Sequence, residues 1–343
     1  MSVDIGQRIR QYRLLKSMTQ EQLAQRLNLT PQAVSKWENG ATMPDIQLLP
    51  ELSVLLGVSI DALFSMTDDA RFDRIESMLE DVRFLPEGEF TQAERWLRER
   101  REDSDARPRA TLLLAGLYNK RAQEYHELAS PLAREALRLN PECKDAHNAI
   151  FDAEGGVYQD WNCANHHRLI DHYKGVVEAR PDDRRNYYWL LDLLIADRRT
   201  GEARDYLARL RRVADTYHCE LYQGQIHLAE CDLEAALDCF RRMRERDPEN
   251  WLVWAAYADE MARLCRYDEA LENYERAMPL RPKPRFVDCE ESVAQIHEIR
   301  GERAGAARMH RRIVQILGED WGVTEGEAVD AHLREIARLE GRA

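Results

Sequence analysis

The sequence of 343 residues predicts an all-α protein in two parts. Residues 19–40 contain two short amphipathic helical patterns, each with its own start signal. From residue 70 onward, small and aromatic residues recur in helical patterns at intervals of 33 to 40 residues. No aromatic-rich run alternates in the manner of a β-strand. We therefore expect a helical head at residues 1–66 and a helical repeat domain at residues 67–343.

The stretch from residue 19 to residue 40 carries clear helix boundaries. Thr19 followed three residues later by Gln22 is a capping box, and Thr30 precedes a proline at the first position of the second helix. Gly40 supplies the stop signal. Five apolar residues face inward from the two helices and share one small core: Leu23, Ala24, Leu27, Val34 and Trp37. The pattern predicts a helix-turn-helix.

These residues resemble the lambda-repressor/Cro-like helix-turn-helix family from Ile5 to Phe64, with the blocks TQEQLA, VSKWENG and GVSIDALF in the family's order. Two capped amphipathic helices are common in all-helical proteins, so the alternative interpretation is an αα-hairpin that binds no partner molecule. The resemblance implies a five-helix repressor-like head that binds duplex DNA. It also implies that Arg13 and Glu38 form an internal ion pair between the first and third helices.

The remaining helices of the head follow from prolines, glycines and caps. Residues 5–16 form the first helix, and a turn between two prolines leads to a fourth helix that begins at Pro50 and ends at Gly57. Ser59 caps a fifth helix, whose Leu63 and Phe64 should close the core. The polar residues 65–69 are expected to join the two parts.

The third helix should read the DNA sequence, because side chains from the N-terminal half of a recognition helix reach base edges. The expected base-contacting residues are Gln32, Ala33, Ser35 and Lys36. Glutamine can bond adenine bidentately, lysine prefers guanine acceptors, and alanine could touch a thymine methyl group. Phosphate contacts are expected from Gln20, Thr30 and Asn39. A solvated helix face is the alternative for each residue.

The net charge of −13 gives DNA binding no global support. Residues 1–68 carry six Lys and Arg against seven Asp and Glu, so the acidic excess lies in the repeats. Binding must therefore rest on a local basic face, formed by Arg10, Lys16, Arg26 and Lys36. We expect a modest and salt-sensitive affinity.

Composition points to a cytoplasmic protein. No apolar run approaches the roughly 18 residues of a membrane span, and the first ten residues do not resemble a signal peptide. Seven cysteines without a C-x-x-C pair indicate thiols in a reducing compartment. The only local histidine cluster, His166, His167 and His172, lacks a second ligand pair at metal-finger spacing. We predict no metal, no cofactor and, without a nucleophile–base pairing or phosphate loop, no enzymatic activity.

The repeat is clearest from Trp251 onward, where seven residues have the spacing of a tetratricopeptide repeat: Trp254, Tyr257, Ala258, Ala270, Tyr274, Ala277 and Pro282. The matching anchor positions along the chain are Ala93, Ala129, Leu169, Ala203, Ala236, Ala270 and Ala306. The resemblance implies a right-handed solenoid of six to seven repeats. Gly155 and Gly156 predict a longer turn within one repeat, and residues 330–339 predict a capping helix.

In tetratricopeptide repeats the first helix of each pair lines the concave face. The inward positions, counted from the anchors, are Tyr118, Arg121, Arg185, Tyr188, Asp192, Gln225, Asp259, Glu291 and Gln295. These mostly polar side chains suit an extended peptide, whose backbone amides need hydrogen-bond partners. Asp192, Asp259 and Glu291 favour a ligand with a basic or free amino group. A solvated acidic trough is the alternative.

A repressor-like head on such a body looks like bacterial one-component transcription regulators, among them the Rgg/PlcR/Rap-like peptide receptors. The resemblance implies a homodimeric regulator whose repeats bind a peptide or protein effector. Two alternatives remain open, because tetratricopeptide repeats also serve as scaffolds. The repeats could serve only for dimerisation, or the chain could be an adaptor that does not bind DNA.

Overall fold

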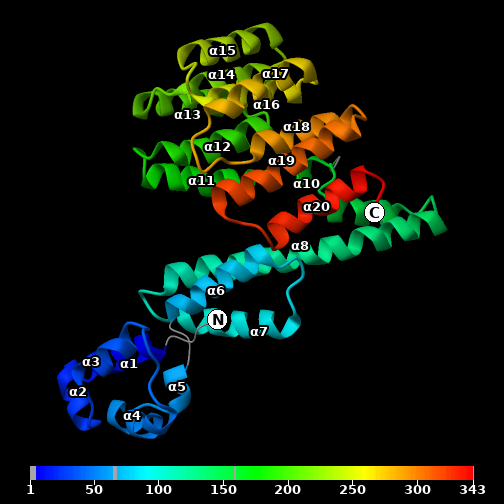
Figure 1. The fold of residues 1–343 in the computed structure, drawn as a ribbon. Coiled ribbons are helices and arrows are strands. Elements are labelled where there is room, and N and C mark those ends of the chain that lie inside the picture. The colour runs from blue at the N-terminus through cyan, green and yellow to red at the C-terminus, as the bar shows by residue number, and fades with distance from the viewer. Residues whose placement is uncertain (1–4, 65–67, 158–159, 343) are drawn as a thin grey trace. The chain divides into compact units, whose positions relative to one another are not determined.

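The computed structural model describes residues 5–64, 68–157 and 160–342, and within these ranges it contains helices and turns but no strand (Figure 1). The predicted all-α class is confirmed. The chain forms two compact units, Met1–Leu128 and Ala129–Ala343, called unit 1 and unit 2 below. The predicted boundary after residue 66 stays a prediction. None of the helices in the described ranges combines the length and apolarity needed to cross a membrane.

The head at the start of unit 1 contains the five expected helices: α1 (Ile5–Leu15), α2 (Gln20–Arg26), α3 (Pro31–Glu38), α4 (Leu49–Leu56) and α5 (Ile60–Phe64). The capping box is present, because the Thr19 hydroxyl accepts from Gln22 N while the Gln22 side chain accepts from Thr19 N. Asn28 turns the chain between α2 and α3 with a φ of 55°. Gly57 ends α4 at a φ of 70°.

Three details of the head differ from expectation. A 3-10 turn, Ile46–Leu48, leads into α4, which begins one residue before Pro50. Leu63 is fully buried as predicted, but Phe64 is 42% exposed and does not close the core. Residues 65–67 of the expected joining segment lie outside the described residues, and Asp68 already begins the next helix.

The rest of unit 1 is built from α6 (Asp68–Asp81), α7 (Glu87–Arg100) and the first part of α8 (Arg107–Leu139). Phe72 and Trp96 meet edge to face between α6 and α7, with ring centroids 4.8 Å apart. The helix pair expected around the anchor Ala129 is instead one continuous helix of 33 residues, and α8 runs through Pro131 without a break.

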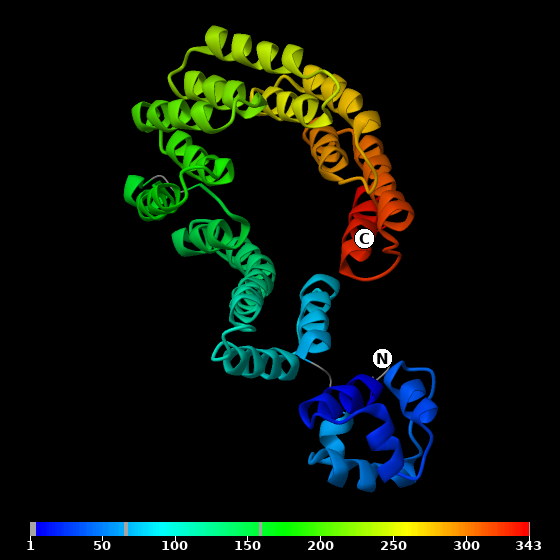
Figure 2. The same ribbon diagram turned by 90° about the vertical axis from the view of Figure 1, so that its left-hand side faces the viewer.

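Unit 2 continues as a series of helices (Figures 1 and 2). These are α9 (Lys144–Glu154), α10 (Trp161–Ala164), α11 (His167–Ala179), α12 (Arg184–Ala196), α13 (Thr200–Val213), α14 (Tyr217–Ala229), α15 (Leu233–Arg246), α16 (Trp251–Arg263), α17 (Tyr267–Ala277) with a 3-10 turn (Met278–Leu280), α18 (Asp288–Ile299), α19 (Arg303–Trp321) and α20 (Glu327–Leu339). Neighbouring helices from α11 to α20 pack as successive pairs.

Small residues at the anchors allow the helices of a pair to approach closely. The anchors Ala203, Ala236, Ala270 and Ala306 are fully buried. On the facing helix, a Cβ added at Gly224 would lie 2.3 Å from Phe240 Cε1, so only glycine fits there. The anchor proposed at Leu169 is wrong by one position, because Leu169 is 49% exposed while Ile170 is fully buried.

The turn between the two helices repeats as regularly as the helices. It carries one residue with a left-handed backbone in four successive pairs: Arg198 (φ 55°), Cys231 (φ 65°), Cys265 (φ 58°) and Gly301 (φ 75°). Gly155 ends α9 at a φ of 71°, and the longer turn predicted at Gly155 and Gly156 includes residues 158 and 159, which lie outside the described residues.

A helix occupies the segment that was predicted to form a capping helix. It begins three residues before the predicted start, and α20 packs on α19 with Val329, Ile336 and Leu339 buried. The Arg338 guanidinium lies between Glu335 of its own helix and Glu298 of α18.

Candidate nucleic-acid interface and repeat cavities

One face of α3 points to solvent while the opposite face forms the core of the head. Val34 and Trp37 are buried beneath the helix. Gln32 and Lys36, one helical turn apart, are exposed, and Ala33 and Ser35 between them are half-buried. The structure therefore brings the four predicted base-contacting residues onto one accessible surface.

The three residues expected to contact phosphate differ in their surroundings. Thr30 is exposed at the N-terminus of α3, and its hydroxyl does not cap the helix. Asn39 Nδ2 lies 3.4 Å from Ser35 Oγ. Gln20 is half-buried, and its Nε2 donates to Glu38 Oε2 at 2.8 Å. Thr30 is therefore the freest of the three to meet a phosphate, while Gln20 also serves the interior of the head.

The ion pair implied by the resemblance is present and buried. Arg13 Nε and Nη2 donate to the two carboxylate oxygens of Glu38 at 2.6 and 2.9 Å. Arg13 Nη1 also donates to the Met18 carbonyl at 2.7 Å. Burial by itself would raise the pKa of Glu38, but hydrogen bonds from Arg13 and Gln20 hold the pKa below its usual value. The pair fixes α3 against α1 and thereby orients the exposed face of α3.

All four residues of the expected basic face, Arg10, Lys16, Arg26 and Lys36, are exposed. They lie on α1, the turn after α1, α2 and α3, the elements that surround the candidate interface. An anionic backbone could therefore meet positive charge beside the recognition residues.

The nine predicted groove residues all reach the surface at least in part. Tyr118 and Arg121 lie on α8 within unit 1, where the Tyr118 hydroxyl donates to Glu94 at 2.6 Å and the Arg121 guanidinium lies over Phe90. The other seven belong to unit 2. Of these, Asp192 and Gln225 line one cavity and Tyr188 lines another, while Arg185, Glu291 and Gln295 line neither.

The first cavity has a volume of about 620 Å³ and lies between α12, α14 and α16. It has mixed chemistry, with polar and charged groups beside aliphatic ones: Asp192, Arg198, Gln225, Glu260, Arg263, Ile195, Ala196, Leu228 and Ala229. Glu260 is 3% exposed, and burial raises the pKa of its carboxyl group. Gln225 Nε2 donates to Glu260 Oε1 at 2.7 Å.

The sequence prediction selected Asp259, one residue before Glu260. Asp259 accepts a hydrogen bond from the Tyr274 hydroxyl and does not line this cavity. Two adjacent carboxylates on one helix look alike in sequence, and only packing decides which of them faces the cavity.

The second cavity has a volume of about 500 Å³ and contains a stack of three rings. His218 lies between Tyr188 and Tyr217, with centroid distances of 4.2 and 4.0 Å. Burial, with a smaller effect from Arg184, lowers the pKa of His218 to about 4, so the ring is neutral at pH 7. The buried Tyr188 Oη has no hydrogen-bond partner among the described residues. The stack is an aromatic surface with one unused hydroxyl group.

A metal-like cluster occurs that sequence spacing did not reveal. Single ligand atoms of Glu298, His310 and Glu335 lie within 4.8 Å of one another, contributed by α18, α19 and α20. Arg338 already pairs with both carboxylates. The cluster therefore has its own cation, and its evident role is to fasten the capping helix.

Comparison with known proteins places the clearest similarity in the head. A family model described as helix-turn-helix matches residues 9–63. The SPbeta prophage-derived uncharacterized HTH-type transcriptional regulator YonR of Bacillus subtilis (strain 168) is 37% identical over 83 residues, which cover 24% of this chain and 75% of the relative. The HTH-type transcriptional activator BcrR of Enterococcus faecalis is 38% identical over 63 residues, 18% of this chain and 31% of the activator. The predicted helix-turn-helix is confirmed.

Solved structures resemble the chain more distantly. A crystal structure of Bacillus thuringiensis PlcR in complex with the peptide PapR7 and DNA aligns with 99% of this chain and 95% of its own, at 13% identity and a TM-score of 0.20. A crystal structure of MamA aligns with 45% of this chain and 90% of its own, at 17% identity and a TM-score of 0.32. At such TM-scores neither likeness supports a statement about function.

Replacing Arg13 alone should destabilise the head more than replacing both partners of the ion pair. Arg13→Met leaves the Glu38 carboxylate buried without its cation, which costs about 3–5 kcal/mol, whereas Arg13→Met with Glu38→Leu removes both charges. Amide hydrogen exchange of residues 5–64 in the full chain measures the difference. Equal protection in the single and double variants would show that the pair does not hold the head together.

The ion pair should also make the stability of the head depend on pH. In the wild type its contribution to the free energy of unfolding should be complete above the unfolded pKa of Glu38, and it should be lost as the pH falls through the lowered folded pKa.

Proposed function

Because the chain belongs, through its head, to the helix-turn-helix family, we propose that it is a sequence-specific DNA-binding transcriptional regulator whose repeats bind a peptide or protein effector. The observation that carries the DNA-binding part is the division of α3 into a buried face and an exposed face that presents Gln32 and Lys36. The expected compartment is the cytoplasm.

In this proposal α3 enters the major groove and the buried ion pair holds its angle of entry. Gln32 and Lys36 select bases, and the basic face beside them contacts phosphates. Specific binding should weaken with added salt, because the basic face contacts phosphates and the acidic excess of the repeats adds no attraction of its own.

Replacing Gln32 and Lys36 together with alanine should abolish sequence selection and leave the fold intact. Both side chains are exposed, so neither supports the core. Selection of bound duplexes from a random pool, with circular dichroism as the folding check, measures the effect. The matched control is Gln47→Ala with Glu51→Ala, two exposed residues outside α3, which should select the wild-type site. Selection of the same site with equal strength by the α3 variant would refute the assignment.

We also propose a homodimer, because one small head offers little contact area and such heads bind paired half-sites. The start of unit 2 supports a protein contact there. Between residues 129 and 169 only Ala133 and Ala146 are buried among the described residues. The same stretch leaves six large apolar side chains 49–82% exposed: Leu132, Leu139, Phe151, Val157, Trp161 and Leu169. We take these six exposed apolar side chains as the proposed contact between the two protomers.

Sedimentation velocity of the full chain should therefore show a dimer. Leu139→Asp with Trp161→Asp should shift it to the monomer, because each side chain is about 80% exposed in one protomer and would be covered in the dimer. Val54→Asp, at an equally exposed apolar residue of the head, is the control and should leave the dimer intact. If only Val54→Asp gives a monomer, the contact lies in the head.

The effector proposal rests on the 620 Å³ cavity. Its carboxylates and the Gln225 amide offer partners to a backbone or an amino group, and its aliphatic side chains offer apolar surface to short apolar side chains of the peptide. Two alternatives to this proposal remain. The chain could be a regulator whose repeats serve only for dimerisation, or it could be an adaptor that does not bind DNA.

A set of short peptides with free amino termini should contain members that raise the melting temperature of the full chain, and acetylation of those peptides should weaken the effect. A peptide at 100 times its Kd stabilises the folded state by about 2.7 kcal/mol. Asp192→Asn should reduce the shift without changing DNA binding in the absence of peptide. Arg185→Ala, outside the cavity on the same helix, is the control. If no peptide shifts the melting temperature, the dimerisation scaffold is the better account.

A further inference from the structure

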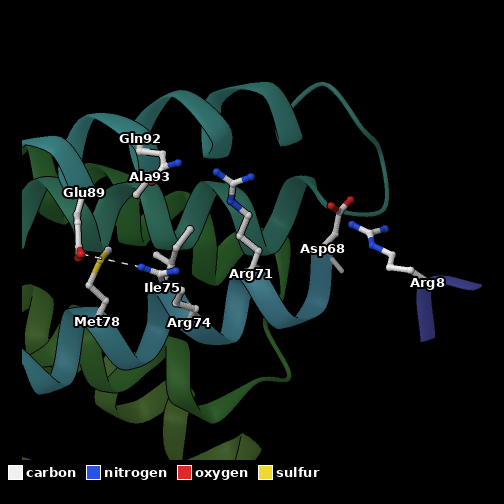
Figure 3. Close-up of a pocket in the computed structure, with 9 residues that line it drawn as sticks. All are labelled: Arg8, Asp68, Arg71, Arg74, Ile75, Met78, Glu89, Gln92 and Ala93. Atoms are coloured by element: carbon white, nitrogen blue, oxygen red, sulfur yellow. Dashed lines mark ion pairs between the residues drawn. The ribbon is translucent and has the colours of Figure 1, made fainter. Parts of the chain in front are cut away.

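A cavity of about 380 Å³ lies between α6 and α7 in unit 1, with Arg8 of α1 at one end (Figure 3). Part of its lining is apolar, formed by Ile75, Met78 and Ala93. The remaining lining contains three arginines, two carboxylates and one amide: Arg8, Arg71, Arg74, Asp68, Glu89 and Gln92. Neither the helix-turn-helix surface nor the repeat cavities involve this site.

Arg71 is the unusual group in this cavity. It is half-buried, and its guanidinium lies 4.8 Å from the centre of the Trp96 ring. Within residues 5–64, 68–157 and 160–342 Arg71 has no hydrogen-bond or ion-pair partner. Burial lowers the pKa of Arg71 despite the charges of Asp68 and Glu99, and the neighbouring Arg74 and Arg95 lower it further. Arg71 is thus a partly buried cation that lies near the charges of Asp68 and Glu99 but forms an ion pair with neither.

A second arginine in the same unit shows what such a group ordinarily has. Arg109 lies 4.9 Å from the centre of the Phe72 ring, and its guanidinium also bonds Glu76 and Asp73 at 2.6–3.0 Å. The cavity's own carboxylates serve other cations. Asp68 accepts from Arg100 at 3.1 Å, and Glu89 lies 3.9 Å from Arg74, the contact marked in Figure 3.

We propose that this cavity binds the phosphate or carboxylate group of a small organic anion, with Arg71 as its main ligand. A guanidinium offers two parallel N–H donors that match either oxyanion, and partial burial strengthens the contact. Arg74 and the Gln92 amide can supply further donors, and the apolar lining can receive the carbon part of the ligand. A phosphate of the DNA backbone presents the same chemistry and is the second source of the group.

Titration of the full chain with potassium phosphate, at an ionic strength held constant with potassium chloride, tests the site. The melting temperature of the wild type should rise and saturate, whereas Arg71→Met should show only the unsaturating rise that phosphate gives any protein. Methionine keeps an apolar stem against Trp96, so this variant should fold. Arg83→Met is the control, because Arg83 also lies over a ring, Phe84, but is paired with Glu127 outside the cavity. It should respond as the wild type does.

A second measurement observes the phosphate itself by phosphorus NMR. The ³¹P signal of phosphate should broaden with the wild-type chain and sharpen again when acetate is added in excess. A different outcome is that free phosphate gives neither effect, while Arg71→Met reduces the slope of log affinity for duplex DNA against log salt concentration by about 1, the value of one phosphate contact. In that outcome the ligand of Arg71 is a phosphate of the DNA backbone. If Arg71→Met changes neither the phosphate response nor the salt dependence, the cavity is not an oxyanion site.

Discussion

Each helix pair of unit 2 can bury its apolar face only against its neighbours, and the rest of the unit follows from this constraint. The alanine anchors and Gly224 bring two helices together, and the larger residues then fill the space between pairs. A series built in this way leaves an apolar face at each end. Helix α20 covers the C-terminal face, fastened through Arg338 to two carboxylates. The other end of unit 2, where apolar side chains remain exposed, is the end that the proposed dimer would cover.

The head satisfies a different constraint, because it is too small to rely on apolar burial alone. Its short α3 is held by a bidentate ion pair to α1, and the carboxylate of that pair also binds Gln20. The same network that fixes the helix therefore includes a residue expected at the DNA. If Gln20 turned to contact a phosphate, its hydrogen bond to Glu38 would change, and the orientation of α3 against α1 would change with it.

Sequence reasoning succeeded where a local signal sets the structure. Caps, prolines and glycines placed the helices of the head to within a residue or two, and the period of the anchors located the pairs from Ala203 onward. It failed where packing decides between equivalent neighbours, as with Leu169 and Ile170 or Asp259 and Glu260. It also missed the continuity of α8 and the unpaired Arg71, because neither leaves a periodic pattern.

The left-handed turns of unit 2 have a consequence for its evolution. A left-handed backbone costs an ordinary L-residue about 1–2 kcal/mol, and glycine avoids this cost. Of the four equivalent turns only the one at Gly301 has glycine, while Arg198, Cys231 and Cys265 retain side chains. The solenoid therefore holds an unused reserve of stability at three surface positions, of which Cys231 and Cys265 lie outside the described cavities and Arg198 lines the first cavity. Proteins commonly retain such positions, because selection removes only those mutations that lower stability below what function needs.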